Sequence, residues 1–240
     1  MSKPTKKISE KENQDLEGEE EESPGRVSSV IPTILAFADD PVKLYLREIG
    51  RIELLDADHE FWLSARMKAH ESFEKSRKHL DPKENERQLL LTYCEEMCDV
   101  CDDLHRSAKK SKASLPDLAL TLSEAQMLRQ TWRIDQPSYL RSFLDSEYWG
   151  NRKKTEDLVK TIFQVYLGLY LLPAEMAQSL LMHLQDKSHL PDARFFKKHL
   201  PDERILKRNF KEIQFLYEES NQALIRANLR LVVSVAKRYM

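Results

Sequence analysis

The sequence predicts an all-α protein, and three features of its 240 residues indicate this class. Glycine accounts for only 5 residues, β-branched runs are few, and 41% hydrophobic with 32% charged residues is typical of a soluble, mostly helical chain. No apolar stretch reaches the roughly 18 to 20 residues that cross a bilayer. The start, MSKPTKKISEKENQ, has no apolar signal-peptide core. We therefore expect a cytoplasmic protein without a membrane-spanning segment.

Residues 1–38 are predicted to form a disordered acidic tail. Residues 10–22 hold eight acids against one lysine, and such a block repels itself and cannot bury apolar surface. The tail would either keep the chain in solution or compete with nucleic acid for a basic surface.

A short helix is predicted directly after this tail. Asp40 is a good N-cap, Pro41 suits the first helical position, and Gly50 would end the helix with a left-handed turn. The spacing of the apolar residues predicts one buried face, made of Val42, Tyr45, Leu46 and Ile49.

A second helix is predicted from Ala57 to about Leu80, with Asp56 as its cap. Asp58 and Glu60 lie in the first turn, near the positive end of the helix dipole. His59 stands where a capping box would have glutamate, which weakens that box and adds a titratable group. Trp62 is either a core residue or a stacking surface, and packing is the commoner role of an aromatic side chain.

Two strings in this chain resemble segments of a known family. The string DPVKLYLREIG at residues 40–50, followed by Ile52-Glu53-Leu54-Leu55, resembles the amino-terminal core segment of the housekeeping bacterial sigma factors of the sigma-70 family. The string RANLRLVVSVAKRY at residues 226–239 is similar to the segment that opens the family's central helical domain. The resemblance implies four parts: the tail 1–38, region 1.2-like helices 39–75, a variable helical insert 76–205, and a long helix 206–240 ending at the start of region 2.

The same resemblance implies a function and its site residues. A sigma factor acts in transcription initiation by bacterial RNA polymerase, and here it would contact the melted non-template strand at the downstream minus-ten and discriminator region. The flipped-base pocket would be formed by Leu54, Glu60, Asn228 and Leu231. The discriminator contact would come from Tyr45, Leu46 and Arg47. The basic rim for phosphates would be Arg226, Arg230, Lys237 and Arg238.

Simpler roles remain open for several of these residues. By periodicity alone, Leu54, Leu231 and Tyr45 would be core residues. Glu60 would only interact with the helix dipole, and Asn228 would only face solvent.

The partners implied are core RNA polymerase, through its beta-prime clamp, and the single-stranded non-template strand of promoter DNA. Most clamp contacts would come from segments that follow the last helix, so we expect the chain to be a fragment of a sigma factor. The alternative is a free-standing helical regulator that binds RNA polymerase or a sigma factor without recognising a promoter. Neither role requires a cofactor, a metal or catalysis.

The middle of the chain is predicted to be a series of helices. Leu-Pro dipeptides followed closely by an acid mark helix starts at Pro116, Pro173, Pro191 and Pro201. The apolar pattern then continues without a breaker to Leu231, so a long helix should carry Asn228.

A cysteine window within this series suggests a second class of function. Cys94, Cys98 and Cys101, with His105 beyond, have the three-cysteine spacing that radical enzymes use for an iron–sulfur cluster. The window lies in a strong helical pattern with five acids and no glycine for a ligand loop, which favours structural cysteines.

Overall fold

The computed structural model describes residues 41–79, 85–146 and 152–236. The predicted tail 1–38 and the predicted rim residues Lys237 and Arg238 lie outside these ranges. The chain divides into two units, residues 1–44 and 45–240, and all the packing described below lies within the second.

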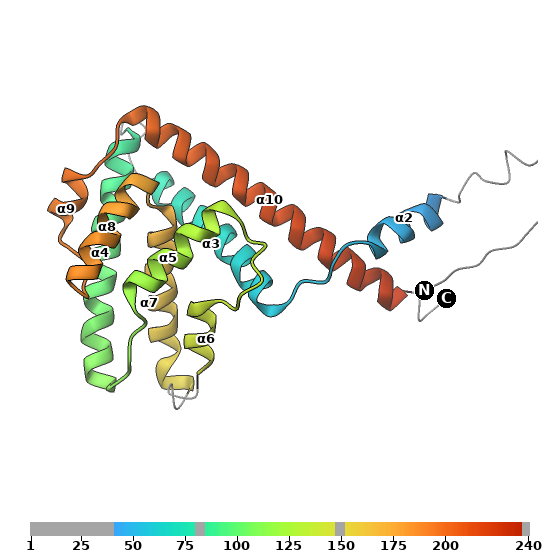
Figure 1. The fold of residues 1–240 in the computed structure, drawn as a ribbon, viewed down its shortest axis with the longest axis horizontal. Helices are drawn as coiled ribbons and strands as arrows, with labels where there is room; N and C mark the ends of the chain where they lie inside the picture. The colour runs from blue at the N-terminus through green and yellow to red at the C-terminus, as the bar shows by residue number, and fades with distance from the viewer. Residues whose placement is uncertain (1–40, 80–84, 147–151, 237–240) are drawn as a thin grey trace, which may run out of the picture. The chain divides into compact units, whose positions relative to one another are not determined.

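The all-α class is confirmed, because every regular element of the described residues is a helix (Figure 1). The helices are α2 Pro41–Gly50, α3 Ala57–His79, α4 Glu86–Ser111, α5 Leu118–Gln130, α6 Tyr139–Asp145, α7 Arg152–Leu171, α8 Ala174–Asp186, α9 Ala193–Lys198 and α10 Glu203–Ala236.

Helix α7 is the central element of the packed part. It contacts α3, α4 and α5, and every residue from Val165 to Leu172 is buried. A helical stretch that is apolar on all sides must be surrounded by other helices, as the second half of α7 is. Gly168 leaves room for Met97 of α4, since a Cβ built there would meet Met97 Sδ at 2.6 Å.

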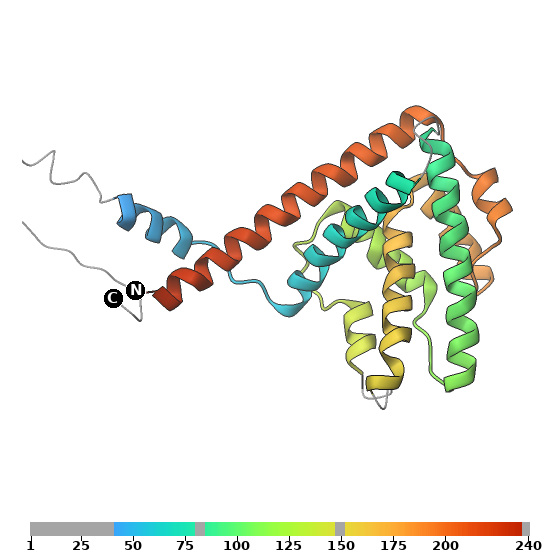
Figure 2. The same ribbon diagram turned by 180° about the vertical axis from the view of Figure 1, so that it is seen from behind.

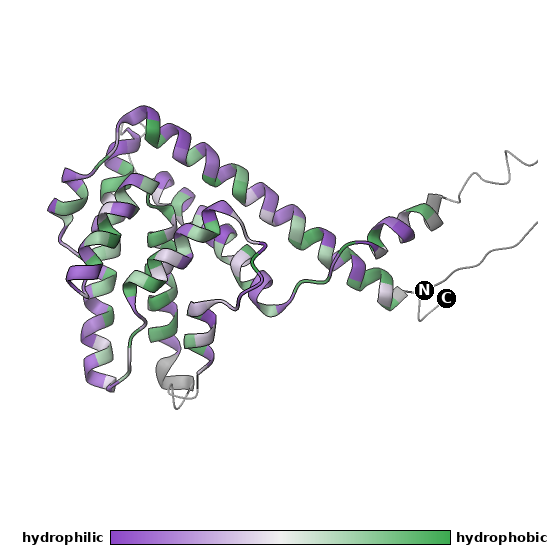
Figure 3. Ribbon diagram, in the orientation of Figure 1, coloured by the Kyte–Doolittle hydropathy of each residue, from purple (hydrophilic) through white to green (hydrophobic). Residues whose placement is uncertain are grey.

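Helix α10 packs lengthwise against α3, as the two opposite views show (Figures 1 and 2). Its buried side includes Ile213, Leu216, Ser220 and Ala227, which recur at helical spacing. Hydrophilic and hydrophobic residues therefore alternate along its length (Figure 3). The predicted long helix is confirmed, and it does carry Asn228.

All four Leu-Pro signals precede a helix start, so those predictions are confirmed. The prolines, however, lie at or just before the caps rather than in the first turn. Asp117 and Asp192 are the N-caps of α5 and α9, and their carboxylates accept hydrogen bonds from the N–H groups of Leu120 and Phe195. The acid near each proline therefore acts through a side-chain cap at these two helices.

The extents predicted for α2 and α3 are confirmed, but two details of α2 are wrong. Of its predicted buried face, Ile49 is buried whereas Tyr45 is 46% exposed, and the side chains of Val42 and Leu46, like the predicted cap Asp40, lie outside the described residues. Gly50 is the last helical residue of α2 and does not adopt the left-handed conformation that we expected of it. Asp56 caps α3, because its Oδ1 accepts from the His59 N–H at 2.8 Å and lies 2.7 Å from His59 Nδ1. The His59 N–H bond lowers the pKa of the Asp56 carboxyl. His59 thus supports the Asp56 side-chain cap through its N–H and its ring, whereas the reciprocal bond that a glutamate would make to the Asp56 N–H is not among the described contacts.

Asp58 joins α3 to the insert rather than only facing the helix dipole. Its carboxylate accepts from Arg141 Nε at 2.7 Å and from the Ser138 N–H at 3.0 Å. The Arg141 bond lowers the pKa of the Asp58 carboxyl from its ordinary value of 3.8. The stabilisation is therefore fully present above pH 3.8 and is lost as the pH falls through the lower folded-state value.

The Asp58→Asn variant should lose about 1 to 2 kcal/mol of unfolding free energy at pH 7, because a charge-assisted pair becomes neutral. The difference from wild type should shrink as the pH falls below 3.8. Urea unfolding at several pH values measures both effects. Asp145→Asn is the matched control, since Asp145 binds the same Arg141 from an exposed position and should contribute less than about 0.5 kcal/mol. A difference in unfolding free energy between wild type and Asp58→Asn that stays constant down to pH 2 would contradict this account.

The three cysteines are structural, as the helical pattern favoured. Cys94 and Cys101 are buried in α4, and Cys98 is half-buried. Burial raises the pKa of all three thiols, to about 11 for Cys98 and about 12 for Cys101. Thiols in this state are inert toward nucleophilic chemistry near neutral pH. Within the described ranges, no group of three or more His, Cys, Asp or Glu side chains is arranged to hold a metal ion.

Candidate functional site

A cleft of about 480 Å³ lies where the two sigma-like segments meet the insert. Four segments line it: the loop 51–55, His59 at the start of α3, residues 132–135 of the loop after α5, and residues 223–227 of α10. Residues more than 170 positions apart in the chain thus share one site. Both sigma-like segments and the insert contribute residues to this cleft.

Packing between α3 and α10 positions two of these walls. Arg66, which is 1% exposed, donates from Nη1 to Glu219 on α10 at 2.8 Å. One and two turns further along, His70 stacks on Tyr217 at 4.4 Å and Phe73 packs on Phe210 at 4.5 Å between ring centroids. These pairs run antiparallel along the two helices, so they bring residues 223–227 beside the start of α3.

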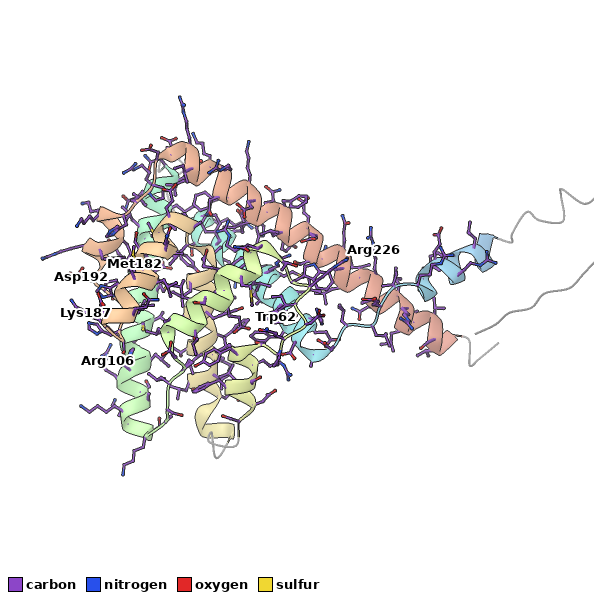
Figure 4. All side chains as sticks on the ribbon, in the orientation of Figure 1. Trp62, Arg106, Met182, Lys187, Asp192 and Arg226 are labelled. Carbon is purple, nitrogen blue, oxygen red and sulfur yellow. The ribbon has the colours of Figure 1, made fainter. Side chains whose placement is uncertain are left out.

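The insert is joined to α3 by buried polar contacts. Trp62 Nε1–H donates to Glu124 on α5 at 2.8 Å, and Arg66 donates to the Leu128 carbonyl from both Nε and Nη2. Trp62 is only 1% exposed, which confirms its predicted core role (Figure 4). The loop that follows α5 is therefore held next to the beginning of α3.

Arg230 fixes the loop 51–55 from the side of α10. Its Nη1 donates to the backbone carbonyl of Ile52, and the Ile52 N–H donates to Ile49 O at 3.2 Å. We expected Arg230 to be a rim cation for phosphates. In the structure its guanidinium is half-buried and one of its donors is used by the protein itself.

The interior wall of the cleft is aromatic. The His59 ring meets Trp62 at 5.8 Å and Trp132 at 5.7 Å, edge to face in both cases. His59 therefore contacts the core through Trp62 and the cleft through Trp132. Such T-shaped contacts are favourable for aromatic rings and hold their orientation.

The rim of the cleft carries three exposed arginines and two acids. Arg51 and Arg226 come from the two sigma-like segments, and Arg133 comes from the insert. Glu53 and Asp135 are the acids. Arg51 and Arg226 form no ion pair with any described residue, so both guanidinium groups are available to an anion.

The structure places the predicted site residues as follows. Leu54 is 64% exposed, Leu231 58% and Tyr45 46%, so the alternative that they are core residues is wrong for this chain. Glu60 and Asn228 are also exposed, and Arg47 is exposed on α2. Leu46 belongs to α2 as well, but its side chain is outside the described ones.

Only part of the predicted set lies in the cleft itself. Leu54 and Arg226 line it, whereas Glu60, Asn228 and Leu231 do not. The lining residues that sequence reasoning missed include Arg51, Trp132, Arg133 and Asp135. The last three of these lie in the string TWRID, an aromatic beside a cation in a loop after a helix, but nothing in that string indicates proximity to Leu54.

Comparisons with known proteins agree with part of this picture. The family model for Sigma-70 factor, region 1.2, matches residues 40–72, which span α2 and most of α3. No match was found for the chain among curated proteins or among solved structures. The region 1.2 match supports a relationship to the sigma-70 family, a sigma-factor-like role and an association with RNA polymerase in general. Within the described ranges, no helix combines the length and apolarity that crossing a membrane requires.

Proposed function

We propose that this chain acts in bacterial transcription initiation as a sigma-factor component of RNA polymerase holoenzyme. In this role it contacts the melted non-template strand at the downstream minus-ten and discriminator region. One observation carries the proposal: Leu54, inside the segment that matches region 1.2, lines the same cleft as Arg226 from the distant α10. A site for a melted strand needs both an apolar surface for a base and a cation for a phosphate.

The exposure of the apolar site residues supports the proposal further. Leu54 and Tyr45 are large hydrophobic side chains that stay exposed in the described part of the chain, so both are available to contact a ligand. Unstacked bases present flat apolar faces and are the ligands that such side chains fit. We further propose that the chain works by binding and not as an enzyme.

The test is site-specific photo-crosslinking in an assembly of the full chain, core RNA polymerase and a promoter DNA with a premelted bubble. A benzophenone amino acid at Leu54 should crosslink to the non-template strand at the downstream edge of the minus-ten element. Leu120 is the matched control site, because it is an exposed leucine of α5 outside the cleft.

Two results would count against the proposal. A chain that does not bind core polymerase contradicts the sigma-factor role itself. A chain that binds core polymerase, competes with an intact sigma factor and gives no crosslink from Leu54 is instead the free-standing regulator. Glu60→Ala and Asn228→Ala test the flipped-base pocket, since either change should weaken discrimination at that base if the pocket assignment is right.

A further inference from the structure

The insert contributes one wall of the cleft, although the resemblance assigned no site residue to it. Trp132, Arg133 and Asp135 lie in the loop between α5 and α6. They face the same space as Leu54 and Arg226, which come from the two sigma-like segments (Figure 4 labels Arg226).

Hydrogen bonds at both ends hold this loop in place. At its start, the Thr131 N–H donates to Met127 O at 3.1 Å, and Thr131 Oγ1 accepts from the Arg133 N–H at 3.1 Å. At its end, the Ser138 N–H donates to Asp58 and its hydroxyl donates to the buried Glu124. The backbone that carries Trp132 and Arg133 is therefore held in place.

The two side chains form a stacked pair at the cleft. The guanidinium carbon of Arg133 lies 5.1 Å from the centroid of the Trp132 ring, a cation–π arrangement. Trp132 is half-buried and its ring meets His59, whereas Arg133 is exposed. A planar guanidinium supported from one side by an indole offers its other face to a planar ligand.

The charges around this pair favour a polyanion with unstacked bases. Arg51 and Arg226 have no ion-pair partner among the described residues and flank the same space, which gives three arginines against Glu53 and Asp135. Stacking surfaces interleaved with cations are the chemistry by which proteins hold single-stranded nucleic acid.

We propose that the insert binds the single-stranded DNA directly, with a base stacked on Arg133 over Trp132 and the neighbouring phosphates at Arg51 and Arg226. This inference rests on the proposed function and adds to it a binding surface from outside the sigma-like segments. The insert is then part of the strand-binding site as well as a packing module.

The test measures binding of the full chain to a fluorescent single-stranded oligonucleotide that carries a minus-ten element and discriminator, by anisotropy at several salt concentrations. Arg133→Ala should weaken binding about tenfold, through the loss of one stacked base. Arg133→Lys should lose most of the same affinity, because lysine keeps the charge but not the planar surface. Arg226→Ala should instead reduce the salt dependence by about one phosphate contact, a change of about 0.7 in slope.

The controls separate this inference from folding and from general charge. Arg106→Ala removes an exposed arginine of α4, away from Arg226, and should leave binding unchanged (Figure 4). A duplex of the same sequence should bind more weakly and should not respond to Arg133→Ala. Thermal unfolding should show that the exposed Arg133 variants are as stable as wild type, whereas Trp132→Ala is expected to affect both stability and binding.

Each outcome has a definite meaning. Wild-type affinity in Arg133→Lys overturns the stacking role, and wild-type affinity in Arg133→Ala overturns the insert's contribution while leaving the proposed function intact. A wild-type chain that does not bind the strand overturns the cleft assignment. The association with core polymerase, measured separately, then decides whether the sigma-factor role also fails.

Discussion

Arg66→Ala should lower the free energy of unfolding by about 3 to 5 kcal/mol, because it removes a buried charge from a site that is built around it. The Arg66 side chain is 1% exposed and donates to the Leu128 carbonyl at 2.9 and 2.6 Å and to Glu219 at 2.8 Å. Alanine leaves that buried carbonyl without its two donors and leaves a cavity between three helices. Urea unfolding followed by far-ultraviolet circular dichroism measures the loss.

Arg77→Ala is the matched control on the same helix. Arg77 is exposed and, among the described residues, pairs only with Glu74 one turn away, so its removal should change stability by less than about 0.5 kcal/mol. If Arg66→Ala were within about 1 kcal/mol of wild type, the contacts joining α3 to α5 and α10 would not be those described.

Glu124→Ala should cost about 3 to 4 kcal/mol, since one buried carboxylate serves three donors. Its Oε1 accepts from Trp62 Nε1–H at 2.8 Å and from the Ser138 hydroxyl at 2.6 Å, and its Oε2 accepts from the Leu140 N–H at 2.9 Å. Alanine leaves all three donors buried and unpaired, and each such group costs about 1 to 3 kcal/mol before relaxation.

Glu124→Gln separates hydrogen bonding from side-chain volume. Glutamine keeps one acceptor oxygen but turns an amide NH₂ toward the other donors, so about half of the loss should remain. Glu95→Ala, an exposed position on α4, should be close to neutral. Equal stability of Glu124→Gln and wild type, by the same urea titration, would show that the Leu140 N–H bond contributes nothing.

The class and many element boundaries could be predicted from local patterns. The start of α3 at Ala57, its cap at Asp56 and the long α10 all follow from helical periodicity and capping chemistry, which depend on residues a few positions apart. Trp62 was predicted to be a core residue because aromatic side chains usually serve packing, and the structure buries it.

Periodicity predicted the wrong exposure for some apolar side chains. Leu54 and Leu231 have apolar side chains at positions where a pattern predicts a core, but both are more than half exposed. An apolar residue at the right spacing shows which face of a helix is hydrophobic. It does not show whether the folded chain supplies a partner for that face.

The full set of residues that line the candidate site could not be predicted from the sequence either. Leu54 and Arg226 were named from resemblance, whereas Trp132 and Arg133 were not, because their place in the cleft depends on how the whole insert packs. His59 and Trp132 meet across 73 positions, and Arg230 reaches the Ile52 carbonyl across 178. No short-range pattern specifies such pairs.

The sequence by itself determined that the chain is helical, where α3 and α10 run, and that residues 40–72 are related to sigma-70 region 1.2. Only the tertiary structure decided that the insert is joined to the sigma-like helices by Glu124 and Arg66, and that its loop completes their cleft. The physical reason is that helix formation depends on neighbours within one or two turns, whereas buried polar partners are chosen by the path of the entire chain.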